Sequence, residues 1–113
     1  MSLDVYLEEM QPVGVYDVSI IHNLGKMAMQ VKVSDTLTLY DILWHADEHG
    51  FTQAEQIAEL LDVGFNELLA DPDRYKQFNP TNNWGTYDNL VNFVYKYRNA
   101  CWDHPESSIK ISR

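Results

Sequence analysis

Two histidines and a glutamate stand close together near the middle of the chain, in the order His45-Ala-Asp-Glu48-His49. This H-x-x-E-H spacing is that of the inverted zinc-peptidase signature, in which two imidazoles one helical turn apart hold Zn²⁺ and the glutamate activates water. A chain of 113 residues leaves little room for a peptidase cleft, and Gly50 directly after the motif is a typical helix stop. We therefore expect two surface histidines near a helix C-terminus, and we predict neither a metal nor a cofactor.

A nucleophilic thiol is the next candidate, because the chain contains a single cysteine, Cys101. A catalytic thiolate needs exposure and a positively charged neighbour, whereas Cys101 lies on the apolar stripe of the last predicted helix. We therefore expect it to be a small buried hydrophobic residue. The five glycines are scattered singly, so the sequence contains no phosphate-binding loop, and no Ser-His-Asp arrangement can be identified, so we predict no catalytic residue.

A second group of candidate residues lies where two predicted helices begin. His22 and Asn23 follow a predicted strand, and Trp84, Thr86 and Tyr87 stand where a turn-rich loop meets the last helix. Free backbone N–H groups at helix starts suit anions or carbonyl oxygens, and an indole beside them could form the floor of a small pocket. Two interpretations stay open: a ligand-binding or enzymatic site, or aromatic core residues with a histidine that holds a loop.

The strands that would position these residues follow from alternating apolar side chains. Alternation predicts strands at 3–8, 15–21 and 108–112, and the turn between the first two makes them an antiparallel hairpin. Leu3, Val5 and Leu7 would face the core.

Apolar residues at helical spacing predict the helices. Their buried stripes run through Leu24 to Val31, Leu39 to Ala46, Ile57 to Leu68 and Tyr87 to Cys101, with an extra turn at Tyr75 and Phe78. Thr52-Gln-Ala-Glu55 has the pattern of a capping box that opens the third helix, and Thr86 is a typical N-cap for the last one.

These elements predict an α+β fold in a single domain over residues 1–113. A two-stranded hairpin is marginal alone, so we expect the C-terminal strand to join it. The expected architecture is a small three-stranded, mostly antiparallel sheet with four or five helices packed on one face.

Acidic residues are concentrated in one part of the chain. The formal net charge is −9, and no Lys or Arg occurs between Val33 and Asp73, a stretch that contains ten Asp or Glu residues. The rest of the chain is nearly neutral, with seven acids and eight bases. Direct nucleic-acid binding is disfavoured, because phosphates require the opposite charge. The tract is either a solvated face that maintains solubility or a surface for a basic partner.

The composition restricts where the protein works. With 45% hydrophobic residues and one cysteine, the chain is typical of a globular domain in a reducing compartment, and we expect a cytoplasmic location. The sequence contains no run of 18 apolar residues and no secretory pattern at its start, so we predict no membrane association.

Several segments together resemble a group of small bacterial and phage proteins that have no assigned activity. The segments are Ile21-His-Asn-Leu-Gly-Lys-Met-Ala28 after the hairpin, Asp71-Pro-Asp-Arg-Tyr-Lys-Gln-Phe-Asn-Pro80, Asn83-Trp-Gly-Thr-Tyr87, Leu90 to Cys101, and a last strand that ends Ser112-Arg113. The group has no histidine pair at the positions of His45 and His49, and it carries Asn-Gly-Trp-Gly where this chain has Asn82-Asn-Trp-Gly85. The resemblance implies the same fold outline and a microbial or phage origin, hence the host cytoplasm for a phage protein, and it implies no mechanism.

These sequence features lead to two hypotheses for the function. The first is a non-enzymatic accessory protein that binds a protein partner with a basic surface through an acidic helical face formed by Glu55, Glu59 and Asp62. At 100° per residue these three carboxylates lie within about 60° of one another, opposite the apolar stripe, and the base-free tract places no Lys or Arg nearby in the sequence. The second is a small-ligand or enzymatic site around the helix starts described above. The sequence specifies no oligomeric state for either.

Overall fold

The structure, a computed structural model, describes residues 2–8, 14–21, 24–79 and 86–112. Three of its elements are strands: β1 (Ser2–Glu8), β2 (Gly14–Ile21) and β3 (Ser108–Ser112). They form one sheet in the order β2-β1-β3, and both pairings are antiparallel. The first strand therefore lies in the centre, where Val5 pairs with Val18 on one side and with Ile111 on the other.

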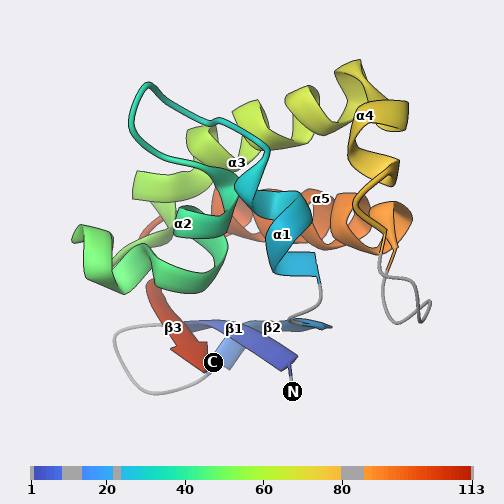
Figure 1. The fold of residues 1–113 in the computed structure, drawn as a ribbon. Helices are drawn as coiled ribbons and strands as arrows, with labels where there is room; N and C mark the ends of the chain where they lie inside the picture. Colours follow the sequence, from blue (N-terminus) through green and yellow to red (C-terminus); the bar gives the residue numbers. More distant parts are fainter. Residues whose placement is uncertain (1, 9–13, 22–23, 80–85, 113) are drawn as a thin grey trace.

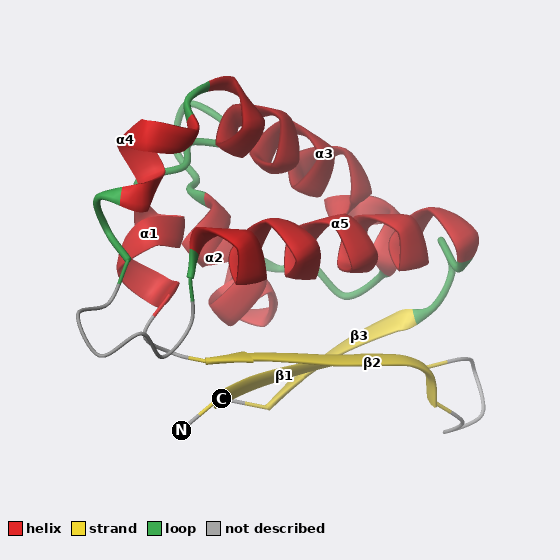
Figure 2. Cartoon of the chain, turned by 90° about the vertical axis from the view of Figure 1, so that its right-hand side faces the viewer, coloured by secondary structure: helices red, strands yellow, loops and turns green. Residues whose placement is uncertain are grey.

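Helices make up most of the described chain. They are α1 (Gly25–Met29), α2 (Leu39–His45), the short 3₁₀ helix η2 (Ala46–His49), α3 (Ala54–Ala70), α4 (Pro72–Lys76) and α5 (Tyr87–Asp103). All of them lie on one face of the sheet, and α5 runs between the sheet and α3 (Figures 1 and 2). The expected α+β class is confirmed: the molecule is mostly helical, with a small antiparallel sheet that includes both terminal strands.

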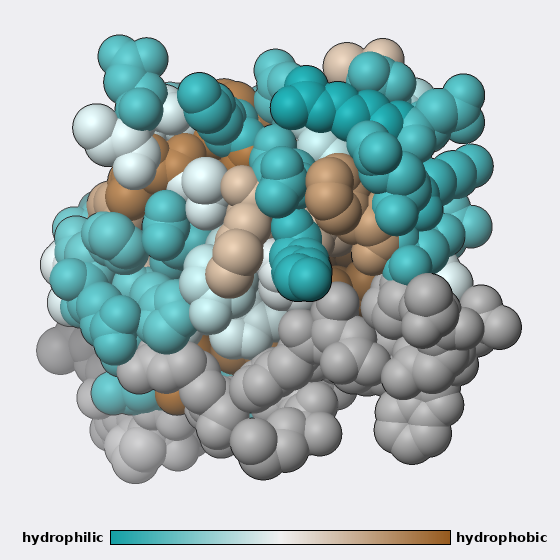
Figure 3. Space-filling model, in the orientation of Figure 1, coloured by the Kyte–Doolittle hydropathy of each residue, from teal (hydrophilic) through white to brown (hydrophobic). Residues whose placement is uncertain are grey.

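The core lies between the sheet and the helices. Leu3, Val5 and Leu7 are completely buried, because alternate residues of β1 point to the helical layer. The predicted stripes of the helices, such as Leu90 and Val94 on α5, belong to the same buried cluster. Hydrophilic side chains cover most of the helical layer on the face seen in Figure 3, and hydrophobic atoms show in small areas between them.

The start of α3 differs from the prediction. The N-cap is Gln53, and Gln56 closes the capping box, so the predicted box of Thr52 and Glu55 is wrong by one residue. The Oε1 atom of Gln56 accepts hydrogen bonds from the backbone N–H groups of both Thr52 and Gln53, at 2.7 and 3.0 Å. The next two N–H groups, of Ala54 and Glu55, donate to backbone carbonyls in the segment that connects α5 to β3. A contact that is distant in sequence thus sets where this helix begins.

The structure explains why glycine occupies two positions, one because of its backbone angle and one because of close packing. Gly50 ends η2 with φ of 83°, a left-handed conformation that side chains disfavour, and this confirms the predicted stop. Gly64 lies where α3 approaches α2: a Cβ atom there would lie 2.8 Å from Cδ1 of Leu39. Within the described residues, no helix is both long and apolar enough to cross a membrane.

Candidate functional site

The histidines of the H-x-x-E-H motif contact groups within their own segment. Nε2 of His45 lies 3.1 Å from the hydroxyl of Tyr40, and its Nδ1 lies 2.9 Å from a carboxylate oxygen of Glu48. Nε2 of His49 lies 3.5 Å from a carboxylate oxygen of Asp41, back at the start of α2. The two imidazoles therefore contact different carboxylates. Within the described part of the chain, no three His, Cys, Asp or Glu side chains are grouped so that they could hold a metal ion.

The alternative site at the helix starts is described only in part. Thr86 is the N-cap of α5: it accepts a hydrogen bond from the N–H group of Asn89, whose side chain closes the capping box. Tyr87 is buried, donates its hydroxyl to the carbonyl of Leu68, and has a raised pKa because burial disfavours its charged form. Both residues thus have structural roles. The other three members of the predicted site, His22, Asn23 and Trp84, lie outside the described residues.

The cysteine is buried, as predicted. Cys101 has no exposed surface, and burial raises the pKa of its thiol to about 12. Almost none of it is thiolate at neutral pH, so this side chain is unsuited to nucleophilic chemistry.

The acidic stripe of α3 is the predicted set of Glu55, Glu59 and Asp62, and these three carboxylates do not all have the same surroundings. Glu55 and Glu59 are exposed, and neither pairs with a described residue. Asp62, however, forms an ion pair with Arg98 of α5 at 2.9 Å. The sequence places no base near the stripe, but the crossing of two helices brings Asp62 together with a base that is 36 positions away. Two carboxylates of the predicted surface therefore have no counter-ion among the described residues.

Arg98 is also the centre of an aromatic cluster that the sequence analysis missed. Its guanidinium carbon lies 4.5 Å from the ring centres of both Phe65 and Trp102, and 5.3 Å from that of Tyr95. Cations prefer such positions over aromatic faces. Only 12% of the arginine side chain is exposed, whereas Tyr95 and Trp102 are 46% and 48% exposed. The rings of Tyr95 and Trp102 thus contact the guanidinium on one side and are partly exposed to solvent on the other.

These residues lie on α3 and α5, which pack against each other. We call them together the α3–α5 face, which consists of Glu55, Glu59, Asp62, Phe65, Tyr95, Arg98 and Trp102. The contacts of Asp62 with Arg98 and of Phe65 with Tyr95 show that the two helices run antiparallel. The N–H group of Glu55 donates to the carbonyl of Pro105, so the first turn of α3 lies near the last turn of α5. The free carboxylates are consequently at the end of the face that carries Trp102.

A signal for this cluster was present in the sequence. Tyr95, Arg98 and Trp102 are spaced i, i+3 and i+7, which places them on one side of a helix. The predicted buried stripe of α5 lies beside this side of the helix, so the three residues are expected at the boundary between the core and the solvent. The contribution of Phe65 from α3 could not be inferred, because it depends on how the two helices cross.

Known proteins give no further guide to this site: the chain matches no protein-family model, no curated protein and no solved structure.

Proposed function

We propose that the protein is a non-enzymatic binding protein that captures another protein through the α3–α5 face, and that this partner presents a basic and partly apolar surface. One observation carries the proposal: two large aromatic side chains, Tyr95 and Trp102, are about half exposed beside free carboxylates. Trp, Tyr and Arg are the residue types that dominate the binding energy of protein interfaces, and here all three lie together.

The aromatic cluster is suited to binding because it is already ordered. Arg98 lies against the rings of Phe65 and Trp102, and its ion pair with Asp62 holds the guanidinium in place. A ring that is fixed before binding loses little conformational freedom when a partner covers it. A cationic or apolar side chain of the partner could then pack on the outer side of the indole.

The charge of the face selects a basic partner. Glu55 and Glu59 are exposed and have no counter-ion among the described residues. Across an interface, opposite potentials accelerate association and exclude partners of the wrong charge. The same carboxylates repel phosphates, which supports a protein rather than a nucleic acid as the partner.

The alternative, a small-ligand or enzymatic site at the helix starts, receives no support from its described members. Thr86 caps a helix and Tyr87 is buried in the core, so neither side chain is available to a ligand.

The proposal is tested by comparing what wild type and surface variants capture from a bacterial lysate, the source that the resemblance implies. Trp102→Ala, and separately Glu55→Lys with Glu59→Lys, should abolish capture of the same protein. Glu67→Lys is the matched control, because Glu67 is an exposed acid on another side of α3, and it should leave capture unchanged. With the purified partner, affinity measured by calorimetry should fall as salt rises.

Two results would contradict the proposal. The first is that wild type retains no protein from the lysate more strongly than the Trp102→Ala variant does. The other is capture that survives the Glu55→Lys and Glu59→Lys changes as well as it survives the Glu67→Lys control.

A further inference from the structure

One edge of the sheet has no partner within the described part of the chain. The strand order β2-β1-β3 places β2 at one edge, and no further strand joins the sheet among the described residues. In Figure 2, β2 runs across the view with no described helix or loop in front of it. An open edge presents a row of backbone N–H and C=O groups that can pair with another strand.

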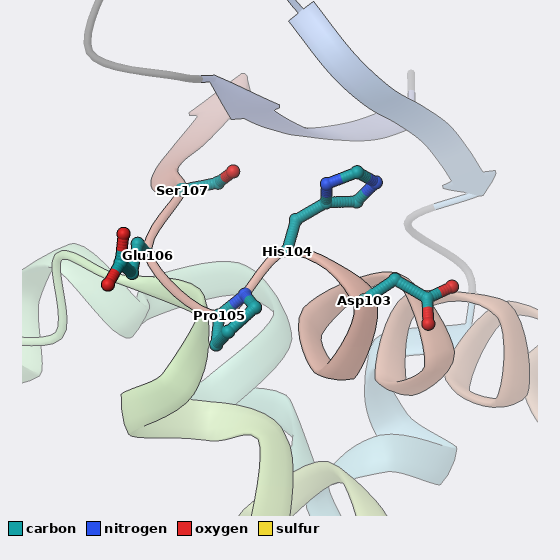
Figure 4. Close-up of a pocket in the computed structure, with 5 residues that line it drawn as sticks. All are labelled: Asp103, His104, Pro105, Glu106 and Ser107. Carbon is teal, nitrogen blue, oxygen red and sulfur yellow. The ribbon is translucent and has the colours of Figure 1, made fainter.

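The opposite edge, along β3, is covered by the chain itself. The N–H group of Ile109 donates to the carbonyl of Thr52 at 2.8 Å. Gln53 forms an antiparallel bridge with Ser108, which directly follows Ser107, the last residue of the connection from α5 to β3 that Figure 4 shows. The two edges therefore differ: the residues before α3 cover the start of β3, whereas no described residue covers β2.

The sequence of β2 lacks the features that usually prevent an edge strand from pairing. Natural edge strands are short, or carry Lys or Pro. This strand has eight residues, Gly-Val-Tyr-Asp-Val-Ser-Ile-Ile, of which four are Val or Ile, and Asp17 is its only charged residue. The register with β1 shifts at Val15, which leaves Tyr16 to Ile21 as a regular ladder. A second strand can therefore pair along this regular part.

The order of residue types in β2 is complementary to itself. An antiparallel pair of two copies can be centred on Val18, so that Tyr16 of each copy lies opposite Ile20 of the other. Aromatic and β-branched residues are favourable cross-strand pairs. In the same register Asp17 lies opposite Ser19, whereas a register centred on Asp17 would place two carboxylates opposite each other. These pairings favour a second copy of this chain, in the register centred on Val18.

This register also continues the helix-covered face of the sheet from one copy to the other. Val18 pairs with Val5 of β1, which is completely buried under the helices. Positions 16, 18 and 20 belong to this same face, because alternate residues of a strand share a side. Two copies joined at Val18 therefore form one sheet, with three strands from each copy and all helices on one side.

The distribution of charge is compatible with contact between two copies along β2. The acidic tract at 33–73 accounts for the net charge of −9, and it lies outside the sheet. The described strands contain four charged residues, Asp4, Glu8, Asp17 and Lys110. A contact along β2 therefore includes none of the acids of the tract, so that it avoids the strongest source of repulsion between copies.

The covered edge at β3 limits the assembly to two copies. A contact in which the same strand of both copies takes part is symmetric and closes on itself. After the two β2 strands have paired, the remaining edges of the enlarged sheet are the β3 strands, which already contact residues 52 and 53. The sheet therefore does not continue into a fibre.

We propose that the protein forms a symmetric dimer in which the β2 strands of two copies pair antiparallel, centred on Val18. The dimer is independent of the proposed capture of a partner, because no residue of the α3–α5 face belongs to the sheet.

Sedimentation equilibrium of the full chain measures the association. A single strand pair with about four to six hydrogen bonds is a small contact, so we expect a dissociation constant in the micromolar range. Hydrogen exchange followed by mass spectrometry locates the contact when it is measured below and above that concentration. The amides of residues 16–20 should exchange more slowly in the dimer, because their hydrogen bonds then form across the edge.

Substitutions at Ser19 test the register. Ser19→Asp should weaken the dimer about tenfold, because symmetry places two pairs of like charges opposite each other. Ser19→Lys should strengthen the dimer about tenfold, because the new ammonium groups lie opposite Asp17 of the other copy. Added salt should reduce both effects.

Ser112 provides the matched control. Ser19 and Ser112 both pair with Asp4 of β1, from its two sides, so the same substitution changes the charge beside Asp4 equally within one copy. Ser112 belongs to β3, however, and lies outside the proposed contact. Ser112→Asp and Ser112→Lys should therefore change the dissociation constant less than about twofold. Circular dichroism shows whether each variant is folded.

Four results would overturn the inference. The first is a chain that stays monomeric at millimolar concentration, and the second is equal dimerisation of Ser19→Asp and Ser19→Lys. The third is slower exchange on association at residues other than β2 alone, and the fourth is growth beyond the dimer. If Ser19→Asp does not fold, Ser19→Lys decides by itself, because its dimer must be tighter than that of wild type.

The dimer and the docking surface fail in different ways. A dimer that Trp102→Ala abolishes and Ser19→Asp leaves unchanged would show that two copies meet through the α3–α5 face, which contradicts pairing at β2. If Ser19→Asp weakens the dimer but capture from the lysate is indifferent to Trp102→Ala, pairing at β2 stands and the docking surface is wrong.

Discussion

Removing the guanidinium of Arg98 should destabilise the whole molecule, because this one group links the two longest helices. Its ion pair with Asp62 at 2.9 Å is partly exposed, and such pairs contribute about 0.2–1 kcal/mol. Its two closest aromatic contacts, each at 4.5 Å, contribute about 0.5–1 kcal/mol apiece. Arg98→Met retains most of the aliphatic packing, so we expect a loss of about 2 kcal/mol in the free energy of unfolding.

Replacing Asp62 separates the contribution of the ion pair from that of the aromatic contacts. Asp62→Asn should cost only about 0.5–1 kcal/mol, because the guanidinium keeps its aromatic contacts. In the double variant the costs should not add, with a coupling of about 0.5 kcal/mol between the two positions. Salt should reduce the effect of Asp62→Asn but hardly change the aromatic part of the Arg98→Met effect.

Urea denaturation followed by circular dichroism measures these free energies, and an unchanged slope with denaturant shows that the comparison is valid. Lys110→Met is the control, since it removes a positive charge from an exposed position on β3. A loss below about 0.5 kcal/mol for Arg98→Met would refute the reasoning, because it would mean that the cluster does not hold α3 to α5.

Three further experiments test other parts of the structure. Gly64→Ala should destabilise by about 1 kcal/mol, because crowding against Leu39 at 2.8 Å outweighs the gain in helix propensity; in a Leu39→Ala background, urea denaturation should show the same change to be stabilising. The thiol of Cys101, whose pKa is about 12, should react with a disulfide reagent about a thousandfold more slowly in the native than in the unfolded chain; rapid native labelling would show that α5 opens locally. The backbone N–H of Thr38 lowers the pKa of Asp41 below 3.8, so this carboxylate stabilises the fold above about pH 4 and its contribution is lost as pH falls through the lowered value; Asp41→Asn should flatten that part of the stability profile, and an unaltered profile would contradict this role.

Local interactions made much of the fold predictable from the sequence. Alternation placed Leu3, Val5 and Leu7 on the inner face of β1, because successive side chains of a strand point in opposite directions. The cap at Thr86 and the stop at Gly50 depend on hydrogen bonds and backbone angles within a few residues, which the chain specifies by itself. The expected burial of Cys101 followed in the same way from helical spacing.

Tertiary contacts decided the start of α3 and the character of the candidate site. The capping box moved to Gln53 and Gln56, because the N–H groups of the first turn meet carbonyls of residues 105 and 107. On a helical wheel Asp62 has acidic neighbours and no basic one, yet in the folded chain it is paired with Arg98. A wheel shows which residues share a side of one helix, but the partner across the interface depends on the crossing and register of two helices, and these arise only when the core packs.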